Sequence, residues 1–206
     1  MQSGLIAGMA ADGLKPVFAV YSSFLQRGYD QLIHDVAIEK LPVTICIDRA
    51  GIVGADGETH QGLFDLIFLY SIPNFVIMAP KNFEEFEAMM EFGINLSKPV
   101  AIRYPRGGDG KIKFKENKNI ELGKAEIIKE GKDITIVAIG KMVEKAFEIS
   151  VLLQKENINA EVINARFLKP LDEETILKSV EKTKRVVTIE DGSIKGGLRK
   201  CNYRSC

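Results

Sequence analysis

Several residue types are scarce in this chain, and their scarcity limits what it can do. The 206 residues include no tryptophan, only two histidines, and three cysteines, Cys46, Cys201 and Cys206. The cysteines are odd in number and lack the spacing of metal ligands, so neither a disulfide framework nor a zinc site is expected. Cys46 lies in an apolar segment, which favours a reduced, cytoplasmic setting.

Net charge and long apolar runs are also absent. Lysine plus arginine and aspartate plus glutamate both number 28, so the formal net charge is zero. Without a basic surplus, no binding to nucleic acid or to an anionic membrane is expected, and any anion site must be local. No apolar run reaches about 18 residues, and no signal-like segment precedes a cleavage site, which argues against membrane spanning and secretion.

What the chain does contain is an alternation of β-branched runs and segments with helical periodicity, typical of βαβ units in an α/β fold with a parallel sheet. An apolar content of 46% suffices for a core, and the length allows two small domains. We expect a first domain at 1–106, a linker at 107–123 where apolar residues become few, and a second, incomplete α/β domain at 124–206. Both ends look cut.

The periodicity also places individual elements. Segments 125–129 and 134–139 are expected to form a hairpin, and Asp172 to cap a helix that runs to about 182. Residues 1–11 resemble the end of a small-residue helix. The other strands are predicted at 17–20, 43–47, 75–78, 100–104, 160–164 and 185–189, and the other helices at 24–40, 63–70, 83–95 and 143–156.

Residues 48–62 are the most informative stretch, because polar and ionisable side chains alternate there with glycines directly after an apolar strand. Such a loop would leave the carboxyl end of its strand, where open parallel sheets hold ligands. His60, four residues after Asp56, could transfer protons, although a lone loop histidine is more often solvated or structural. Outside the loop, His34 fits a packing or interface role.

Two arginines at predicted strand ends, Arg49 and Arg106, are candidates for binding a phosphate, because a guanidinium matches phosphate oxygens in a bidentate manner. The alternative is a pair of surface arginines in weak ion pairs, for example with Asp48 or Asp109. Arg103 could face an interface or solvent, so its role stays open.

Four segments, in this order, resemble the 1-deoxy-D-xylulose-5-phosphate synthase family of transketolase-like thiamine-diphosphate enzymes. The resemblance covers roughly 6–197, from the pyrimidine-binding domain into the C-terminal domain. The family's cofactor-activating glutamate lies just upstream of the stretch that matches 4–10, and its domain for diphosphate and magnesium has no counterpart here. The segments are 21–31 (YSSFLQRGYDQ), 48–60 (DRAGIVGADGETH), 103–107 (RYPRG) and 166–172 (RFLKPLD).

The resemblance implies an enzyme that joins pyruvate, with decarboxylation, to glyceraldehyde 3-phosphate. The product, 1-deoxy-D-xylulose 5-phosphate, begins non-mevalonate isoprenoid precursor synthesis. Thiamine diphosphate and magnesium are the implied cofactors, with no metal ligand in this chain. A homodimer is implied for the full enzyme, and the chain alone is expected to be inactive without a diphosphate-binding domain or chain. The implied site comprises His60 and Asp56 in catalysis, Tyr21, Arg49 and Arg106 at the substrate, and Phe24 and Arg27 at the cofactor.

From periodicity alone, Phe24 would instead pack into the core in the first turn of an amphipathic helix. Two other functions stay open for the chain as a whole. One is a β-type subunit of a 2-oxo acid dehydrogenase or of a split transketolase-like enzyme. The other is a non-catalytic dimerisation module. The run 48–60 favours the synthase over the dehydrogenase.

Overall fold

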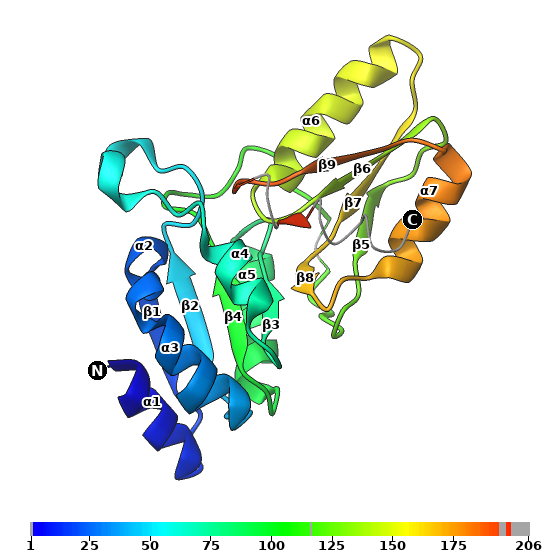
Figure 1. The fold of residues 1–206 in the computed structure, drawn as a ribbon. Coiled ribbons are helices and arrows are strands. Elements are labelled where there is room, and N and C mark those ends of the chain that lie inside the picture. The colour runs from blue at the N-terminus through cyan, green and yellow to red at the C-terminus, as the bar shows by residue number, and fades with distance from the viewer. Residues whose placement is uncertain (1, 116, 194–196, 199–206) are drawn as a thin grey trace.

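Short β-branched runs form two sheets, one in each half of the chain, in the computed structural model (Figure 1). The structure describes residues 2–115, 117–193 and 197–198. In the first half, four strands run parallel in the order β1-β2-β4-β3, which confirms the predicted α/β class. They are β1 (Val17–Tyr21), β2 (Thr44–Asp48), β3 (Val76–Met78) and β4 (Val100–Arg103).

Helices cover both faces of this sheet, because successive strand side chains point to opposite sides. Ile45 and Ile47 join one apolar core, shared with α1, α4 and the helical segment after β1. Ile102 and Met78 join another core, to which α5 contributes Met89. The helices are α1 (Gln2–Ala11), α4 (Asp65–Ser71) and α5 (Phe83–Asn95).

The helix predicted at 24–40 is helical from 22 to 38, but its hydrogen bonding changes along its length. It comprises α2 (Ser22–Leu25), the 3₁₀ turn η1 (Gln26–Gly28), α3 (Tyr29–Gln31) and the π-helix η2 (Leu32–Ile38). Gly28 lies where η1 meets α3, and a Cβ there would be 3.0 Å from the Ser3 hydroxyl of α1. The close approach of α1 therefore accompanies the change in helix type.

The second sheet has the order β5-β7-β6-β9, and this order shows that the predicted hairpin is wrong. β5 pairs antiparallel with β7, whereas β6 lies parallel to both β7 and β9. Every residue of β7 is buried, so this strand takes the central place and separates β5 from β6. The elements are β5 (Glu126–Lys129), β6 (Ile134–Ala138), α6 (Met142–Lys155), β7 (Ala160–Asn164), α7 (Glu173–Thr183) and β9 (Val186–Ile189).

A short strand that the sequence pattern did not reveal, β8 (Phe167–Lys169), leaves the second half and joins the first sheet. It pairs antiparallel with β3, so that Met78 lies opposite Phe167. Phe167 and Leu168 are fully buried. Three residues are too few to show an alternating pattern, and Pro170 follows at once, which explains why periodicity missed it.

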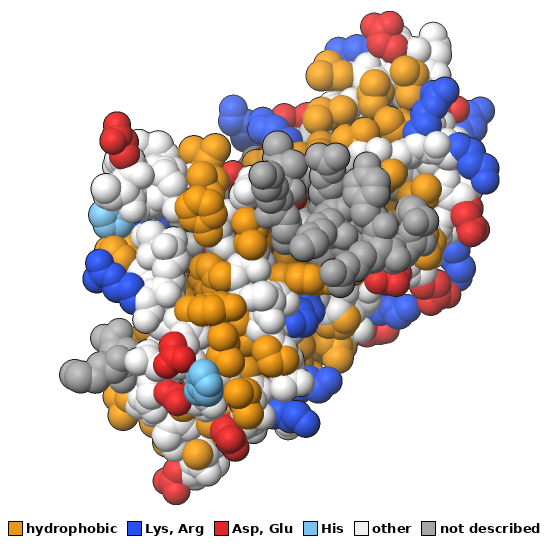
Figure 2. Space-filling view, viewed as in Figure 1, with side chains coloured by type: hydrophobic (Ala, Val, Ile, Leu, Met, Phe, Trp, Pro, Cys, Tyr) orange, Lys and Arg blue, Asp and Glu red, His pale blue; other side chains and the backbone are white. Residues whose placement is uncertain are grey.

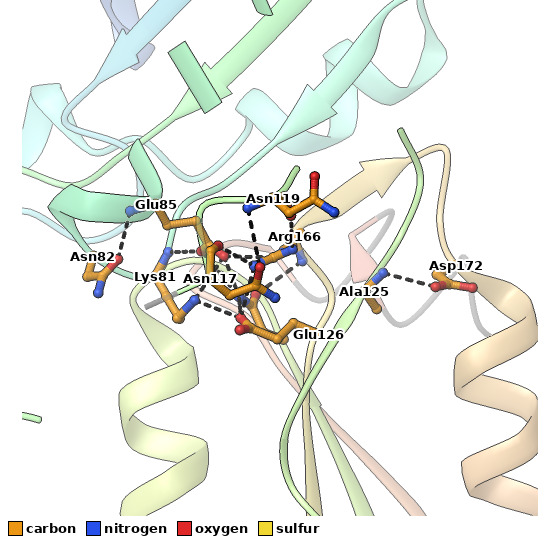
Figure 3. A network of polar contacts seen from close by, with 10 residues as sticks. Lys81, Asn82, Glu85, Asn117, Asn119, Ala125, Glu126, Arg166 and Asp172 are labelled. Atoms are coloured by element: carbon orange, nitrogen blue, oxygen red, sulfur yellow. Dashed lines mark hydrogen bonds and ion pairs between the residues drawn. The ribbon is translucent and has the colours of Figure 1, made fainter. Parts of the chain in front are cut away.

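A buried network of charges lies where the two halves meet (Figure 3). The Glu85 carboxylate of α5 accepts hydrogen bonds from Lys81 Nζ at 3.0 Å and from Arg166 Nε at 2.8 Å. Glu126 of β5 pairs with the same two cations, at 2.7 Å from Lys81 Nζ and 3.3 Å from Arg166 Nη2. Arg166 also donates to the carbonyl oxygens of residues 117 and 119. The network thus joins both halves and the connection between them.

Apolar side chains remain exposed on the face that carries α3 and α4 (Figure 2). No helix within the described ranges is long and apolar enough to cross a membrane.

Candidate functional site

The site residues are brought together by the carboxyl ends of three adjacent strands. Tyr21 ends β1, Arg49 follows β2, and Arg106 follows β4, and these strands are neighbours in the sheet. Arg49 has a left-handed backbone (φ 58°), which turns the chain sharply as it leaves the strand. The Ala50 amide donates to the Tyr104 carbonyl at 3.0 Å, so the segments after β2 and β4 start side by side.

The loop after β2 is closed at its base by a pair of backbone hydrogen bonds. Gly51 and Gly62 exchange N–H···O bonds of 2.7 and 2.9 Å. A Cβ on Gly62 would lie 2.3 Å from the Arg49 carbonyl oxygen, so only glycine fits there. Beyond this base the loop extends past the end of β2 as two short 3₁₀ turns (Figure 1). They are η3 (Gly54–Asp56) and η4 (Glu58–His60), and each ends on a predicted catalytic residue.

Asp56 lies between the two predicted phosphate ligands. Its Oδ1 accepts hydrogen bonds from Arg49 Nη1 and from Arg106 Nη1. Arg49 Nη2 donates to the Tyr21 hydroxyl at 2.8 Å, and its guanidinium lies 4.1 Å from the centre of the Tyr21 ring. The Asp56 side chain is 6% exposed, whereas Arg106 is 46% exposed. The arrangement presents two guanidinium groups at one place, and Arg106 forms its open side.

The electrostatics keep this cluster ionised. Burial alone would raise the pKa of Asp56, but the hydrogen bonds and charges of Arg49 and Arg106 outweigh it and lower that pKa. The hydrogen bond to Asp56 raises the pKa of Arg49, against the opposing effect of burial. Asp56 is therefore an anion at neutral pH, and its charge offsets one of the two positive charges of the arginines.

Three buried polar atoms of this site have no hydrogen-bond partner among the described residues: Ser22 Oγ, Arg49 Nε and Asp56 Oδ2. Burying a polar atom without a partner costs about 1–3 kcal/mol, so such atoms are few in folded proteins. These atoms lie at the carboxyl edge of the first sheet, where they are available to bond a polar ligand.

A flat apolar surface adjoins the charged cluster. The Phe24 ring stacks on Tyr21 with centroids 5.5 Å apart, and it meets the His60 ring edge-on at 5.2 Å. Phe24 is 47% exposed, so the core packing that periodicity alone favoured for it is wrong. An exposed aromatic face fits a flat heterocycle such as the aminopyrimidine ring of thiamine diphosphate. Arg27, on the next turn, is exposed.

His60 is oriented by its neighbours. Its Nδ1 lies 2.8 Å from the Thr59 hydroxyl, and its ring rests against Phe24. His34, the other histidine, is on η2, where its Nδ1 lies 3.0 Å from Asp30 and its side chain is 65% exposed. The described residues contain no group of three or more His, Cys, Asp or Glu side chains that could hold a metal ion.

Two residues support the site. The sequence pattern did not identify Gln61, and it left the role of Arg103 open. The Gln61 amide spans the loop, since Nε2 donates to Val53 O at 2.9 Å while Oε1 accepts from Val53 N at 2.7 Å. No pattern marks a glutamine that bonds across its own loop. Arg103 is buried rather than at solvent; its Nε donates to Asp65 at 2.9 Å, and its Nη2 contacts the second half at the Asp191 carbonyl oxygen. The distant carboxylate partner explains why its role was not legible in the sequence.

Comparisons with known proteins identify the family of the chain. The family model "Transketolase, pyrimidine binding domain" matches residues 2–108, and "Transketolase, C-terminal domain" matches 123–200. A 1-deoxy-D-xylulose-5-phosphate synthase of Halothermothrix orenii is 55% identical over 94% of this chain and 31% of its own length. One of Synechocystis sp. is 51% identical over 94% and 31%. The chain thus spans about a third of the length of the curated relatives it matches.

Solved structures show the same fold. The structure described as "Split gene transketolase, inactive beta4 tetramer" has a TM-score of 0.91 and 32% identity, over 98% of this chain and 66% of its own. A transketolase of Pichia stipitis has a TM-score of 0.80 at 20% identity, over 94% of this chain and 30% of its own, which shows the fold alone.

Proposed function

The chain belongs to the transketolase pyrimidine-binding domain family, whose model matches more than half of it, and we propose that it is a segment of a 1-deoxy-D-xylulose-5-phosphate synthase. The observation that carries the proposal is the convergence of Arg49 and Arg106 on Asp56, beside the exposed Phe24 ring. In the proposed reaction the full enzyme joins pyruvate, with loss of carbon dioxide, to glyceraldehyde 3-phosphate. This step begins isoprenoid precursor synthesis and also serves thiamine biosynthesis.

In this proposal the two arginines bind the phosphate of the aldehyde. A phosphate monoester carries up to two negative charges near neutral pH, which two guanidinium groups can balance with bidentate hydrogen bonds. Asp56 forms ion pairs with both arginines in the free site, offsets one of their two positive charges and holds them at the same place. The Tyr21 hydroxyl fixes the second Nη of Arg49, so this guanidinium is oriented before the substrate arrives. Such preorganisation lowers the entropic cost of binding.

The aromatic surface is proposed to hold the cofactor's pyrimidine ring, with Phe24 stacked on the ring and Arg27 beside it. When bound, thiamine diphosphate supplies the electron sink for the decarboxylation of pyruvate. We place the ligands of the diphosphate and of magnesium outside this chain, in a diphosphate-binding domain or chain. His60 would exchange a proton through Nε2, because Thr59 occupies Nδ1.

At the level of the whole protein, we propose a pyrimidine-binding domain at 1–106, a linker at 107–123 and part of the C-terminal domain at 124–206. We further propose a cytoplasmic homodimer in which this segment needs the diphosphate-binding part for activity. The free, buried Cys46 is consistent with a reducing setting.

The phosphate proposal is tested by the affinity of the purified chain for inorganic phosphate and for glyceraldehyde 3-phosphate, measured by calorimetry or NMR. Arg106→Met should weaken binding of both about tenfold, because it removes a charge-assisted donor from the open side of the site. Arg185→Met, at an exposed position of the second half, is the matched control and should leave the affinity unchanged. Equal affinities for Arg106→Met and the unaltered chain would contradict the proposal.

Activity is tested by carbon dioxide release from pyruvate with glyceraldehyde 3-phosphate, thiamine diphosphate and magnesium. We expect no release from the chain alone and release after addition of the diphosphate-binding domain of a relative. Release from the chain alone would refute the need for that domain.

A second candidate function is the β chain of a split transketolase-like enzyme, because a solved structure described in those terms covers 98% of this chain. With a ketose in place of pyruvate, the chain and the added domain would then transfer a two-carbon unit from the ketose to the aldehyde without releasing carbon dioxide.

A further inference from the structure

Asp191, which follows β9, brings the second half of the chain into contact with the candidate site. Its Oδ1 accepts a hydrogen bond from the Ile52 amide at 3.2 Å, and its other carboxylate oxygen pairs with Lys141 at the start of α6. Its carbonyl oxygen accepts from Arg103 Nη2 at 2.9 Å. The Asp191 side chain is 10% exposed. A nearly buried carboxylate therefore joins the second half to the base of the loop that carries Asp56 and His60.

The loop is shaped to receive this carboxylate. Gly51 has φ +82°, and a Cβ on it would lie 1.9 Å from Asp191 Oδ2. Any other residue at this position would displace the acid. The adjoining Ile52 is bonded to Asp191, and beyond it Gln61 holds Val53 on both its N–H and its carbonyl. Val53 in turn accepts from the Asp56 amide at 3.1 Å. Asp191 is thus connected to Asp56 by its hydrogen bond to Ile52, by the Ile52–Val53 peptide bond and by the hydrogen bond between Val53 and Asp56.

We propose that Asp191 is a positioning residue for the anion site: it fixes Gly51 and Ile52 so that Asp56 stays between Arg49 and Arg106. Lys141 orients the acid by taking one carboxylate oxygen, which leaves the other for the Ile52 amide. Through this contact, docking of the second half determines how well the first half binds phosphate. The inference rests on the proposed function for the identity of the anion, but the placement of the loop does not depend on it.

The experiment compares Asp191→Ala, Asp191→Asn and the unaltered chain by amide hydrogen exchange and by affinity for inorganic phosphate. Asp191→Ala should speed exchange of the 52–56 amides and weaken phosphate binding, each by about tenfold, because the competent loop conformation is less populated. Asp191→Asn keeps an acceptor for Ile52 and should restore most of the protection. Asp12→Asn, an exposed aspartate in the first half, is the control and should change neither quantity.

Unchanged exchange at 52–56 and unchanged phosphate affinity in Asp191→Ala would overturn the inference. If that variant loses protection in β6 as well, it has unfolded, and Lys141→Met decides in its place. Lys141→Met should speed exchange of the 52–56 amides and leave β6 protected. Exchange of these amides at the rate of the unaltered chain would overturn the inference. Failure of the unaltered chain to bind phosphate would refute the proposed function alone, because the exchange data still decide whether Asp191 holds the loop.

Discussion

The Glu85 carboxylate holds together the charges buried between the two halves, so its removal should be costly. Its oxygens accept from Lys81 Nζ at 3.0 Å, Arg166 Nε at 2.8 Å, the Lys81 amide at 2.7 Å and Asn164 Nδ2 at 3.0 and 3.1 Å. The Glu85 side chain is 1% exposed, and Lys81 and Arg166 are each 3% exposed. Water therefore cannot replace the lost acceptor.

Glu85→Gln keeps the shape but removes the charge and turns one acceptor into a donor that faces other donors. Removing one partner of a buried ion pair typically costs about 3–5 kcal/mol. The lower value applies here because Glu126 still pairs with both cations. We therefore expect the free energy of unfolding to fall by about 3 kcal/mol and Tm to fall by about 6–12 °C.

Urea and thermal unfolding, followed by circular dichroism, measure both quantities. Glu84→Gln makes the same change at the neighbouring, exposed position of α5 and should cost no more than about 0.5 kcal/mol. In the double variant with Arg166→Gln, the loss should be smaller than the sum of the single losses, because the two residues contact each other. A Glu85→Gln stability within about 0.5 kcal/mol of the unaltered chain would refute the reasoning.

Two further predictions concern groups with shifted pKa values. Burial would raise the pKa of Asp172, but hydrogen bonds from Ala125 and Thr175 lower it below 3.8, so its stabilisation is present above that pH and is lost as the pH falls through the lower folded value. Asp172→Ala should therefore cost about 1–2 kcal/mol at pH 7 in urea unfolding, and less below pH 3.8, and an equal cost at both would contradict this. Burial raises the pKa of Cys46 to about 11, so in a Cys201→Ser/Cys206→Ser background its alkylation at pH 8 should be about 100-fold slower than that of a free thiol. Alkylation of the folded chain at the rate of a free thiol would count against that burial.

Most of the first sheet could be predicted from the sequence, because buried parallel strands are continuous apolar runs bounded by polar loops. The α5 helix has the bounds its periodicity gave, since Asn82 caps it by accepting from the Glu85 amide. The pairing of β5 could not be predicted. Taken alone, the turn at 130–133 is typical of a hairpin between β5 and β6. In the structure the fully buried β7 lies between these two strands and pairs with both, and the local sequence of the turn does not specify this order.

The candidate site, too, could be predicted from the sequence only in part. Glycines and charged residues after a buried strand indicate a ligand loop, and the structure brings Arg49, Asp56 and Arg106 into contact. The sequence suggested Asp48 or Asp109 as partners of the arginines, but Asp48 instead accepts from the Arg49 amide and Asp109 from the Phe83 amide. Side-chain pairing across 50 residues depends on strand order, which no local pattern specifies.

Because β8 is hydrogen-bonded to β3, the chain crosses between its two halves more than once, and the connection at 107–123 is not a simple hinge. A gene divided at that connection would express a first half whose β3 has an unpaired, apolar edge, the kind of edge that recruits strands from other molecules. A chimera that takes its second half from a relative should therefore take β3 and β8 from the same parent.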